Sequence, residues 1–208
     1  MTRGVQISRM QIMAKQHPRR QVLRMAAGIV ASFTLPRLAA GQELALTPQC
    51  ESKAAVTSAQ TEGPFFKPKS PLRSDFRQAV LGGEIVTLTG FVLTRDCRPV
   101  GNALIDLWHA DAKGDYDNRG FRCRGHQFSD AQGRFGFVTV LPARYPGRTR
   151  HFHVKVQAAN GPVLTTQLYF PDEPANARDP LFRRELLMAV ARSGTERSAR
   201  FDFVVERA

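Results

Sequence analysis

The sequence lacks the features that zinc sites, transmembrane helices and repeat folds require. It contains three cysteines in 208 residues, without a Cys-x-x-Cys pair or another Cys/His spacing typical of zinc. Its apolar run at residues 25–35 has eleven apolar or small residues, whereas a helix needs about 20 to cross a bilayer. It also has no internal repeat and no low-complexity tract. The remaining possibility is one ordinary domain with a real core and with tails.

Acidic residues are absent from residues 1–40, which hold seven basic residues. The formal net charge of +12 at first suggests a nucleic-acid partner. Subtracting those seven positive charges from +12 leaves +5 for residues 41–208, an ordinary and mildly basic domain. We therefore expect no nucleic-acid partner and assign most of the charge to a leader.

That leader has the layout of an export signal. A basic segment (18–24) containing Arg19 and Arg20 precedes the apolar run 25–35, and small residues follow it. This order is typical of a secretory signal, and the paired arginines indicate the twin-arginine route. We expect cleavage after Ala40 and a periplasmic or secreted mature protein with no membrane segment. An uncleaved anchor and a chance basic tail are the alternatives.

The cysteines all lie in the mature part of the chain. An oxidising compartment permits one disulfide among Cys50, Cys97 and Cys123 and leaves one thiol over. Cys97 lies in the turn DCRPV and Cys50 in the N-terminal arm, so we favour that pair. Three unpaired thiols are the alternative.

Short runs of β-branched and aromatic residues follow an N-terminal arm at residues 41–80. Turn sequences such as DAQG and ANGP separate these runs, which predicts an all-β fold for residues 81–208, an antiparallel β-sandwich with long loops. The connection at 111–132 is long for a compact domain, and long loops on rigid sheets often carry function. The expected strands are 85–93, 103–110, 133–141, 151–157, 164–170 and 200–206.

One short C-terminal helix is also predicted. Asp179 is the candidate N-cap, Pro180 takes the first helical position, and residues 181–192 continue the helix. Gly194 lies just beyond its expected end.

Two histidines stand at the same-face spacing of a strand in HFHVKVQ, residues 151–157. Successive side chains of a strand alternate, so His151 and His153 share one face and Phe152 lies on the other. Twice the rise per residue puts the two imidazoles about 7 Å apart along the strand, close enough to converge on one metal. Tyr145, on the preceding loop, could supply a third ligand.

Phenol ligands would narrow the choice of metal. Two imidazoles suit zinc, copper, nickel or iron. A phenol loses its proton only near pH 10, so a tyrosine ligand needs a strongly acidic cation such as Fe(III). Tyr169 lies in a strand run and Tyr116 in a loop, so Tyr116 is the better second phenolate. Each of these residues can equally be a packing residue, and the pattern alone leaves the site open.

Five ordered motifs decide between these interpretations. From about residue 58 to 182 the chain resembles the intradiol ring-cleavage dioxygenases, non-haem ferric enzymes of the protocatechuate 3,4-dioxygenase and catechol 1,2-dioxygenase type. It has no room for the long N-terminal helical segment of the catechol type, so it looks more like a protocatechuate-type catalytic unit. The motifs are QTEGPFF (60–66), WHADAKGDY (108–116), LPARYPGR (141–148), RHFHVKV (150–156) and TTQLYF (165–170).

The resemblance implies a β-sandwich and a ring cleavage between two hydroxyl-bearing carbons by O2, with a cis,cis-muconate-type product. It implies one Fe(III) per chain, a small aromatic diol as substrate and a possible homo-oligomer. The implied metal ligands are Tyr116, Tyr145, His151 and His153. The implied catalytic residues are Tyr145, as a displaceable ligand and base, with Arg148 and Gln167.

Other readings of the same residues stay open. The competing function is a secreted β-sandwich module that binds a metal or ligand without ring cleavage, and copper or zinc are the competing metals. His109 is expected to be structural, and Trp108 to belong to the core or a pocket wall. Phe65 and Phe66 either close the pocket or simply bury the arm.

Overall fold

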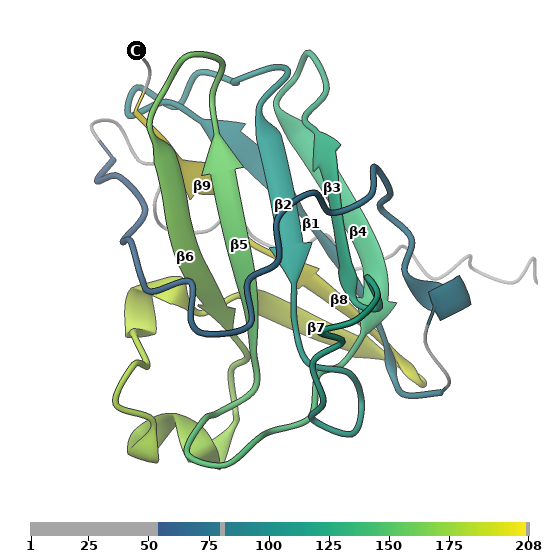
Figure 1. Cartoon of the computed structure of the whole chain (residues 1–208). Coiled ribbons are helices and arrows are strands. Elements are labelled where there is room, and N and C mark those ends of the chain that lie inside the picture. The colour runs from purple at the N-terminus through teal and green to yellow at the C-terminus, as the bar shows by residue number, and fades with distance from the viewer. Residues whose placement is uncertain (1–53, 80–81, 207–208) are drawn as a thin grey trace, which may run out of the picture. The chain divides into compact units, whose positions relative to one another are not determined.

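Two β-sheets form the body of the protein in the computed structural model, which describes residues 54–79 and 82–206 (Figure 1). The first sheet has the order β4-β1-β8-β7, and β9 also pairs with β1. The second has the order β3-β2-β5-β6. The first sheet contains β1 (Ile85–Leu93), β4 (Arg134–Val140), β7 (Ala189–Ser193), β8 (Glu196–Arg200) and β9 (Phe203–Val204). The second contains β2 (Leu104–Trp108), β3 (Arg124–Phe128), β5 (His151–Gln157) and β6 (Val163–Tyr169).

The core lies between the two sheets and follows from alternation along the strands. On β1 the side chains of Val86 and Leu88 are buried, and on β5 those of Phe152, Val154 and Val156. These residues belong to one apolar cluster with members from both sheets. Burial of apolar area at about 25 cal/mol per Å² makes this cluster the main stabilising element of the fold.

Five of the six predicted strands are confirmed, whereas the strand predicted at 200–206 is divided between the end of β8 and the short β9. β1 has the predicted bounds, and β2, β4, β5 and β6 lie within a residue or two of theirs. The long connection at 111–132 contains a further strand, β3, which pairs with β2. The sandwich is also not purely antiparallel, because β8 and β9 both run parallel to β1.

The C-terminal helix predicted from Asp179 onward is wrong. The described segment holds only short 3-10 turns, η3 (Pro174–Arg178) and η4 (Arg184–Leu186), and then β7. β7 and β8 form a hairpin with Ser193 opposite Glu196. Gly194 occupies its turn at φ +60. A glycine with positive φ suits both a helix end and a two-residue hairpin, so the sequence signal was ambiguous.

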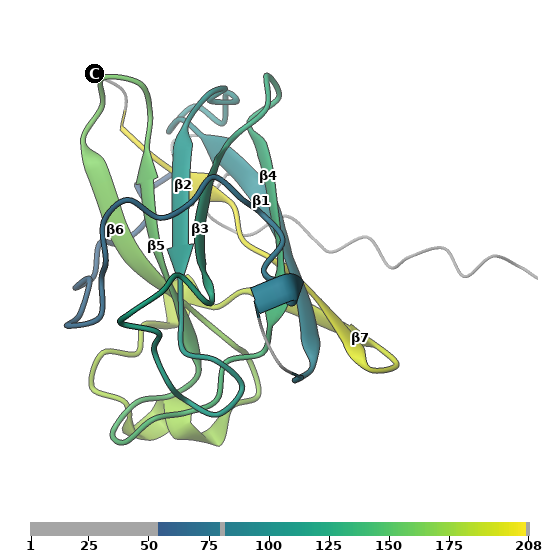
Figure 2. The same ribbon diagram turned by 45° about the vertical axis from the view of Figure 1, so that its right-hand side comes forward.

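The described part of the N-terminal arm crosses the outer face of the second sheet (Figures 1 and 2). The backbone N–H of Gln60 donates to Thr165 O on β6 at 2.8 Å, and that of Arg73 to His126 O on β3 at 3.0 Å. The arm ends near the 3-10 turn η2 (Arg77–Ala79). It therefore covers a sheet face that would otherwise be open to solvent.

Several predictions concern segments outside the described residues, namely the leader at 1–40, its cleavage site and Cys50. Cys97 is disulfide-bonded, and Cys123 is a free, buried thiol. In the described part of the chain, no helix is long and apolar enough to span a bilayer.

Gly90 in β1 leaves room for the chain between β8 and β9, which passes directly over it. A Cβ at Gly90 would lie 1.8 Å from the carbonyl oxygen of Phe201. We expect Gly90→Ala to lower the free energy of unfolding by roughly 3 kcal/mol, since the backbone must move. Urea denaturation followed by circular dichroism measures this.

Gly136→Ala on the neighbouring strand β4 is the matched control. Its nearest non-bonded atom to a new Cβ is 3.7 Å away, which is an ordinary contact. We expect a change within about 0.5 kcal/mol for this variant. Equal stabilities of the two variants would contradict the close packing at Gly90.

Candidate functional site

The two histidines of β5 lie on the outer face of the second sheet, under the N-terminal arm. His153 pairs with Trp108 on β2 and with Gln167 on β6, and His151 pairs with Tyr169. Directly paired residues point to the same face of a sheet, so these side chains form one group. Both histidines are buried although they face away from the core.

The imidazoles converge through their Nε2 atoms, which are 3.1 Å apart. Nδ1 of His151 is 2.7 Å from the carbonyl oxygen of Thr149, which can only accept, so this nitrogen carries the proton. Nε2 of His151 therefore presents its lone pair. His153 is held by stacking on Trp108, with ring centroids 5.0 Å apart and an angle of 8°. Its Nδ1 is buried and has no hydrogen-bond partner among the described residues.

Both predicted phenols lie beside these rings. Tyr116, on the loop between β2 and β3, has its Oη 3.5 Å from Nε2 of His151. Tyr145, on the loop between β4 and β5, has its ring centroid 5.8 Å from those of Tyr116 and His151. The structure thus gathers all four predicted ligands in one cluster. The hydroxyl of Tyr169 is instead engaged by two glutamines, 2.7 Å from Oε1 of Gln60 and 3.1 Å from Oε1 of Gln167.

The donor set fits a metal ion with a preference for hard oxygen. Metal–nitrogen bonds of about 2.1 Å at a right angle put two ligand nitrogens about 3 Å apart, close to the observed separation. In the described ranges, no three His, Cys, Asp or Glu side chains come together as a metal-binding group. A metal at the two histidines would therefore take its further protein ligands from the phenols, which suits a strongly acidic cation.

Burial sets the protonation of the cluster. It lowers the pKa of His151 to about 4, with Arg148 contributing, and lowers the pKa of His153 well below its ordinary value. Both rings are thus neutral at pH 7, as metal binding requires. Burial and the neighbouring Tyr145 raise the pKa of Tyr116 above its ordinary value. That phenol keeps its proton until a cation arrives.

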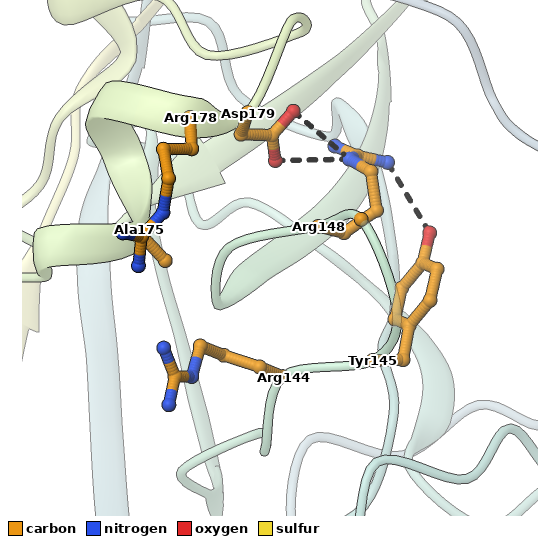
Figure 3. Close-up of a pocket in the computed structure, with 7 residues that line it drawn as sticks. Arg144, Tyr145, Arg148, Ala175, Arg178 and Asp179 are labelled. Atoms are coloured by element: carbon orange, nitrogen blue, oxygen red, sulfur yellow. Dashed lines mark hydrogen bonds and ion pairs between the residues drawn. The ribbon is translucent and has the colours of Figure 1, made fainter.

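Arg148 connects Tyr145 to a buried carboxylate (Figure 3). It also reaches the predicted glutamine. Its guanidinium donates to Tyr145 Oη at 3.2 Å, to Gln167 Oε1, and to Asp179 at 2.9 Å. Asp179 also accepts from the backbone N–H groups of Thr149 and Leu181. The structure therefore fixes Arg148 between the candidate ligand and the amide.

Asp179 is held ionised by these contacts. Burial by itself would raise the pKa of Asp179, but the N–H groups of Thr149 and Leu181 and the Arg148 guanidinium outweigh it. The pKa of Asp179 is therefore below its ordinary value. The carboxylate that was expected to cap a helix instead anchors the arginine of the site.

Arg124, at the start of β3, is fully buried and joins the arm to the Tyr116 loop. It donates to the carbonyl oxygens of Phe65 at 2.7 Å and of Asp117 at 3.0 Å. Its guanidinium lies 5.9 Å from the centroid of the Tyr116 ring. Burial lowers the pKa of Arg124, since its acceptors here are neutral. This cation favours a negative charge on Tyr116 and fixes its position.

The arm encloses the cluster from outside. Phe65 stacks on Tyr116 with centroids 4.4 Å apart, and Phe66 packs against Trp108 at 4.9 Å. A Cβ at Gly63 would come within 3.3 Å of the ring of His153. Phe65 and Phe66 therefore form the wall of the site as well as burying the arm, and Trp108 is both buried and part of the wall.

His109 is structural, as predicted. It is buried, with Nδ1 2.7 Å from the carbonyl oxygen of Ala110 and Nε2 2.7 Å from Oγ1 of Thr139. Its ring packs against Phe152 in the core, on the side of the sheet away from the phenols. Both nitrogens are used, so it is not available to the cluster.

Sequence reasoning missed three parts of this site. The acceptor for His151 is a backbone carbonyl, which leaves no trace in the residue types. Arg124 lies in a stretch without apolar alternation, and a buried arginine has no signature of its own. Asp179 precedes a proline, which is also the pattern of an N-cap, and its pairing with Arg148 spans 31 residues.

Comparison with known proteins adds an independent view of these residues. The chain matches the protein family described as Dioxygenase over residues 61–206, a range that includes all four rings of the cluster. Protocatechuate 3,4-dioxygenase beta chain of Burkholderia cepacia is 34% identical over 119 residues, covering 49% of this chain and 51% of that protein. Catechol 1,2-dioxygenase 2 of Acinetobacter lwoffii is 28% identical, covering 61% and 56%. The chain thus spans about half the length of these relatives.

Solved structures agree with the sequence matches. The dioxygenase domain of a dioxygenase carbohydrate-binding protein fusion from Streptomyces sp. SirexAA-E is 50% identical, with a TM-score of 0.72. The alignment covers 74% of this chain and 100% of that chain. 3-Chlorocatechol 1,2-dioxygenase of Rhodococcus opacus 1CP is 25% identical with a TM-score of 0.68, covering 74% and 73%.

The buried pair of Arg148 and Asp179 leads to a stability prediction. Their side chains are 11% and 1% exposed. Breaking such a pair leaves an uncompensated buried charge, so we expect Asp179→Asn to lower the free energy of unfolding by about 3 kcal/mol at pH 7. Because the pKa of Asp179 is lowered on folding, this contribution is present above the ordinary pKa and disappears as pH falls through the folded value. Wild type and variant should therefore converge in acid.

Asp130→Asn is the control for that comparison. Asp130 also accepts two backbone N–H groups and one arginine, Arg134, but the two side chains are 44% and 59% exposed. We expect a much smaller loss here, because solvent screens an exposed pair. Chemical denaturation at pH 7 and pH 3 measures both variants, and equal losses at pH 7 would show that burial of Asp179 is unimportant.

Proposed function

The chain belongs to the intradiol ring-cleavage dioxygenase family, and on that premise we propose that it cleaves a catechol-type ring between its two hydroxyl-bearing carbons. The proposal includes Fe(III) as the metal, O2 as the co-substrate and a cis,cis-muconate-type product. The observation that carries it is the convergence of two imidazole Nε2 atoms and two phenols at one buried point.

Each side chain of the cluster has a role in this proposal. His151, His153, Tyr116 and Tyr145 would hold the metal. When bound, Fe(III) would accept both oxygens of the diol as anions and make the ring electron-rich toward O2. His151 is oriented for this role by Thr149 O, and His153 by Trp108, because these contacts fix both rings.

Tyr145 is the phenol best suited to receive a proton from the diol. Both phenols lie on loops, but Tyr116 stacks on Phe65 and lies near the buried Arg124, whereas Tyr145 lines a pocket. Its Oη accepts a hydrogen bond from Arg148 at 3.2 Å. Uptake of a diol proton at that oxygen would make the Tyr145 phenol neutral. The neutral phenol could then move away from the diol.

Arg148 and Gln167 would act on the bound ring. Arg148 is oriented by Asp179 before any ligand arrives, so its positive charge can stabilise anionic character on the ring without reorganisation. Gln167 donates to Thr61 O on the arm and accepts from Arg148, which fixes its amide next to His153. Phe65, Phe66 and Trp108 exclude water from the cluster on the side covered by the arm.

Iron-loaded protein tests the proposal directly. We expect visible absorption from tyrosinate-to-iron charge transfer, oxygen uptake with a catechol panel, and products heavier than the substrate by both atoms of one O2. Spectroscopy, an oxygen electrode and mass spectrometry measure these. A protein that takes up zinc or copper and not iron, or an iron-loaded one that consumes no oxygen with any catechol, would favour the competing binding module.

Tyr116→Phe tests the ligand assignment with a spectrum. Loss of one phenolate should weaken or shift the visible band of the iron-loaded protein and lower its activity at least about tenfold, since one coordinating anion is missing. Tyr169→Phe is the comparison for the spectrum alone, because its hydroxyl contacts Gln60 and Gln167 rather than the proposed ligands, and its visible band should equal that of the wild type. An unchanged band in Tyr116→Phe would remove that residue from the ligand set.

A further inference from the structure

A pocket beside Tyr145 carries an excess of positive charge that the proposed ring cleavage does not itself require. It has a volume of about 350 Å³ and is lined by Arg144, Tyr145, Gly147, Arg148, Ala175, Arg178 and Asp179 (Figure 3). Three of these seven residues are arginines, and one is acidic. A volume of this size accommodates a single substituted ring.

The charges in the lining are not equivalent. Asp179 binds Arg148 at 2.9 Å and so compensates that arginine. Arg144 and Arg178 are both exposed. Arg144 lies 3.9 Å from Glu173, which is already bound to Arg150 at 2.7 Å. Arg144 therefore has only a long ion pair to a carboxylate that it shares with Arg150, and Arg178 has no ion pair among the described residues.

Their arrangement gives the pocket a direction. Arg144 comes from the loop before β5 and Arg178 from the end of η3, and in Figure 3 both side chains extend to the same side of the pocket. The Tyr145 ring and Arg148 lie on the other side. A ring whose two hydroxyl oxygens lie beside Tyr145 would point its far substituent toward the two arginines.

We propose that Arg144 and Arg178 form a subsite for a carboxylate on the ring, so that the chain selects catechols bearing an acid group over neutral ones. This rests on the proposed function, because it takes the ring to bind beside Tyr145. A carboxylate has two oxygens that a planar guanidinium binds in a fork, which is why paired arginines favour it over a neutral substituent. Attraction to the same charges also raises the rate at which an anionic ring enters the pocket.

The test measures binding separately from ring cleavage. 4-Hydroxybenzoate and 4-hydroxybenzamide differ in the charge of one substituent, and neither is a diol that the proposed reaction could open. Calorimetry on the iron-loaded protein at low salt should show the acid binding about tenfold more tightly than the amide, as expected for charged hydrogen bonds. The preference should shrink at high salt, because these arginines are exposed to screening.

Substitution then identifies the arginines. The double variant Arg144→Gln with Arg178→Gln should lose most of the preference for the acid, and its relative kcat/KM for 3,4-dihydroxybenzoate against 3,4-dihydroxybenzamide should fall about tenfold. Arg95→Gln, an exposed arginine on the connection after β1, is the control and should keep the wild-type ratio.

The outcomes separate this inference from the proposed function. Equal affinity of wild type for acid and amide, or a preference that survives the double substitution, overturns the carboxylate subsite even if catechols are cleaved. A preference for the acid that depends on the two arginines, without oxygen uptake on any diol, supports the subsite and overturns the proposed ring cleavage.

Discussion

The alternation of side chains along β5 is the constraint on which the rest of the structure depends. One face of this strand supplies Phe152 and Val154 to the core, and the other supplies His151 and His153 to the cluster. Pairing with β2 and β6 fixes the register, so a slip by one residue would exchange core and site. Stability and the convergence of the imidazoles are therefore secured by the same hydrogen-bonded ladder.

Much of this arrangement could be predicted from the sequence because it is local. The strand patterns and the same-face histidines follow from a period of two, and Tyr116 and Tyr145 were identified through motifs at fixed spacings. β3 escaped prediction because RGHQF has no apolar alternation, and only Arg124 and Gly125 are buried, the latter against Arg73 and Phe76. The apparent C-terminal helix failed because tertiary pairing with β8 decided the structure of an ambiguous segment.

Electrostatic organisation could not be predicted, since it depends on contacts between distant parts of the chain. The two arginines nearest the phenols are treated differently: Arg148 is bound to a carboxylate, whereas Arg124 is buried among carbonyl oxygens. The first is a compensated charge that can orient groups by hydrogen bonding. The positive charge of the second has no ion pair with a carboxylate among these acceptors, and it favours the ionised form of Tyr116. Two similar residues thus give the two phenols different environments.

The arm has a consequence for the order of assembly. Several of its bonds with the second sheet join residues more than 100 positions apart, such as Gln60 with Tyr169 and Thr61 with Gln167. Contacts of such high sequence separation form late and slowly in folding. The histidines are enclosed only where the arm covers them, with Gly63 against the ring of His153 and Phe65 against that of Tyr116. If the cluster holds an ion as proposed, the arm would lie between that ion and solvent, and release of the ion would require the arm to lift from the sheet.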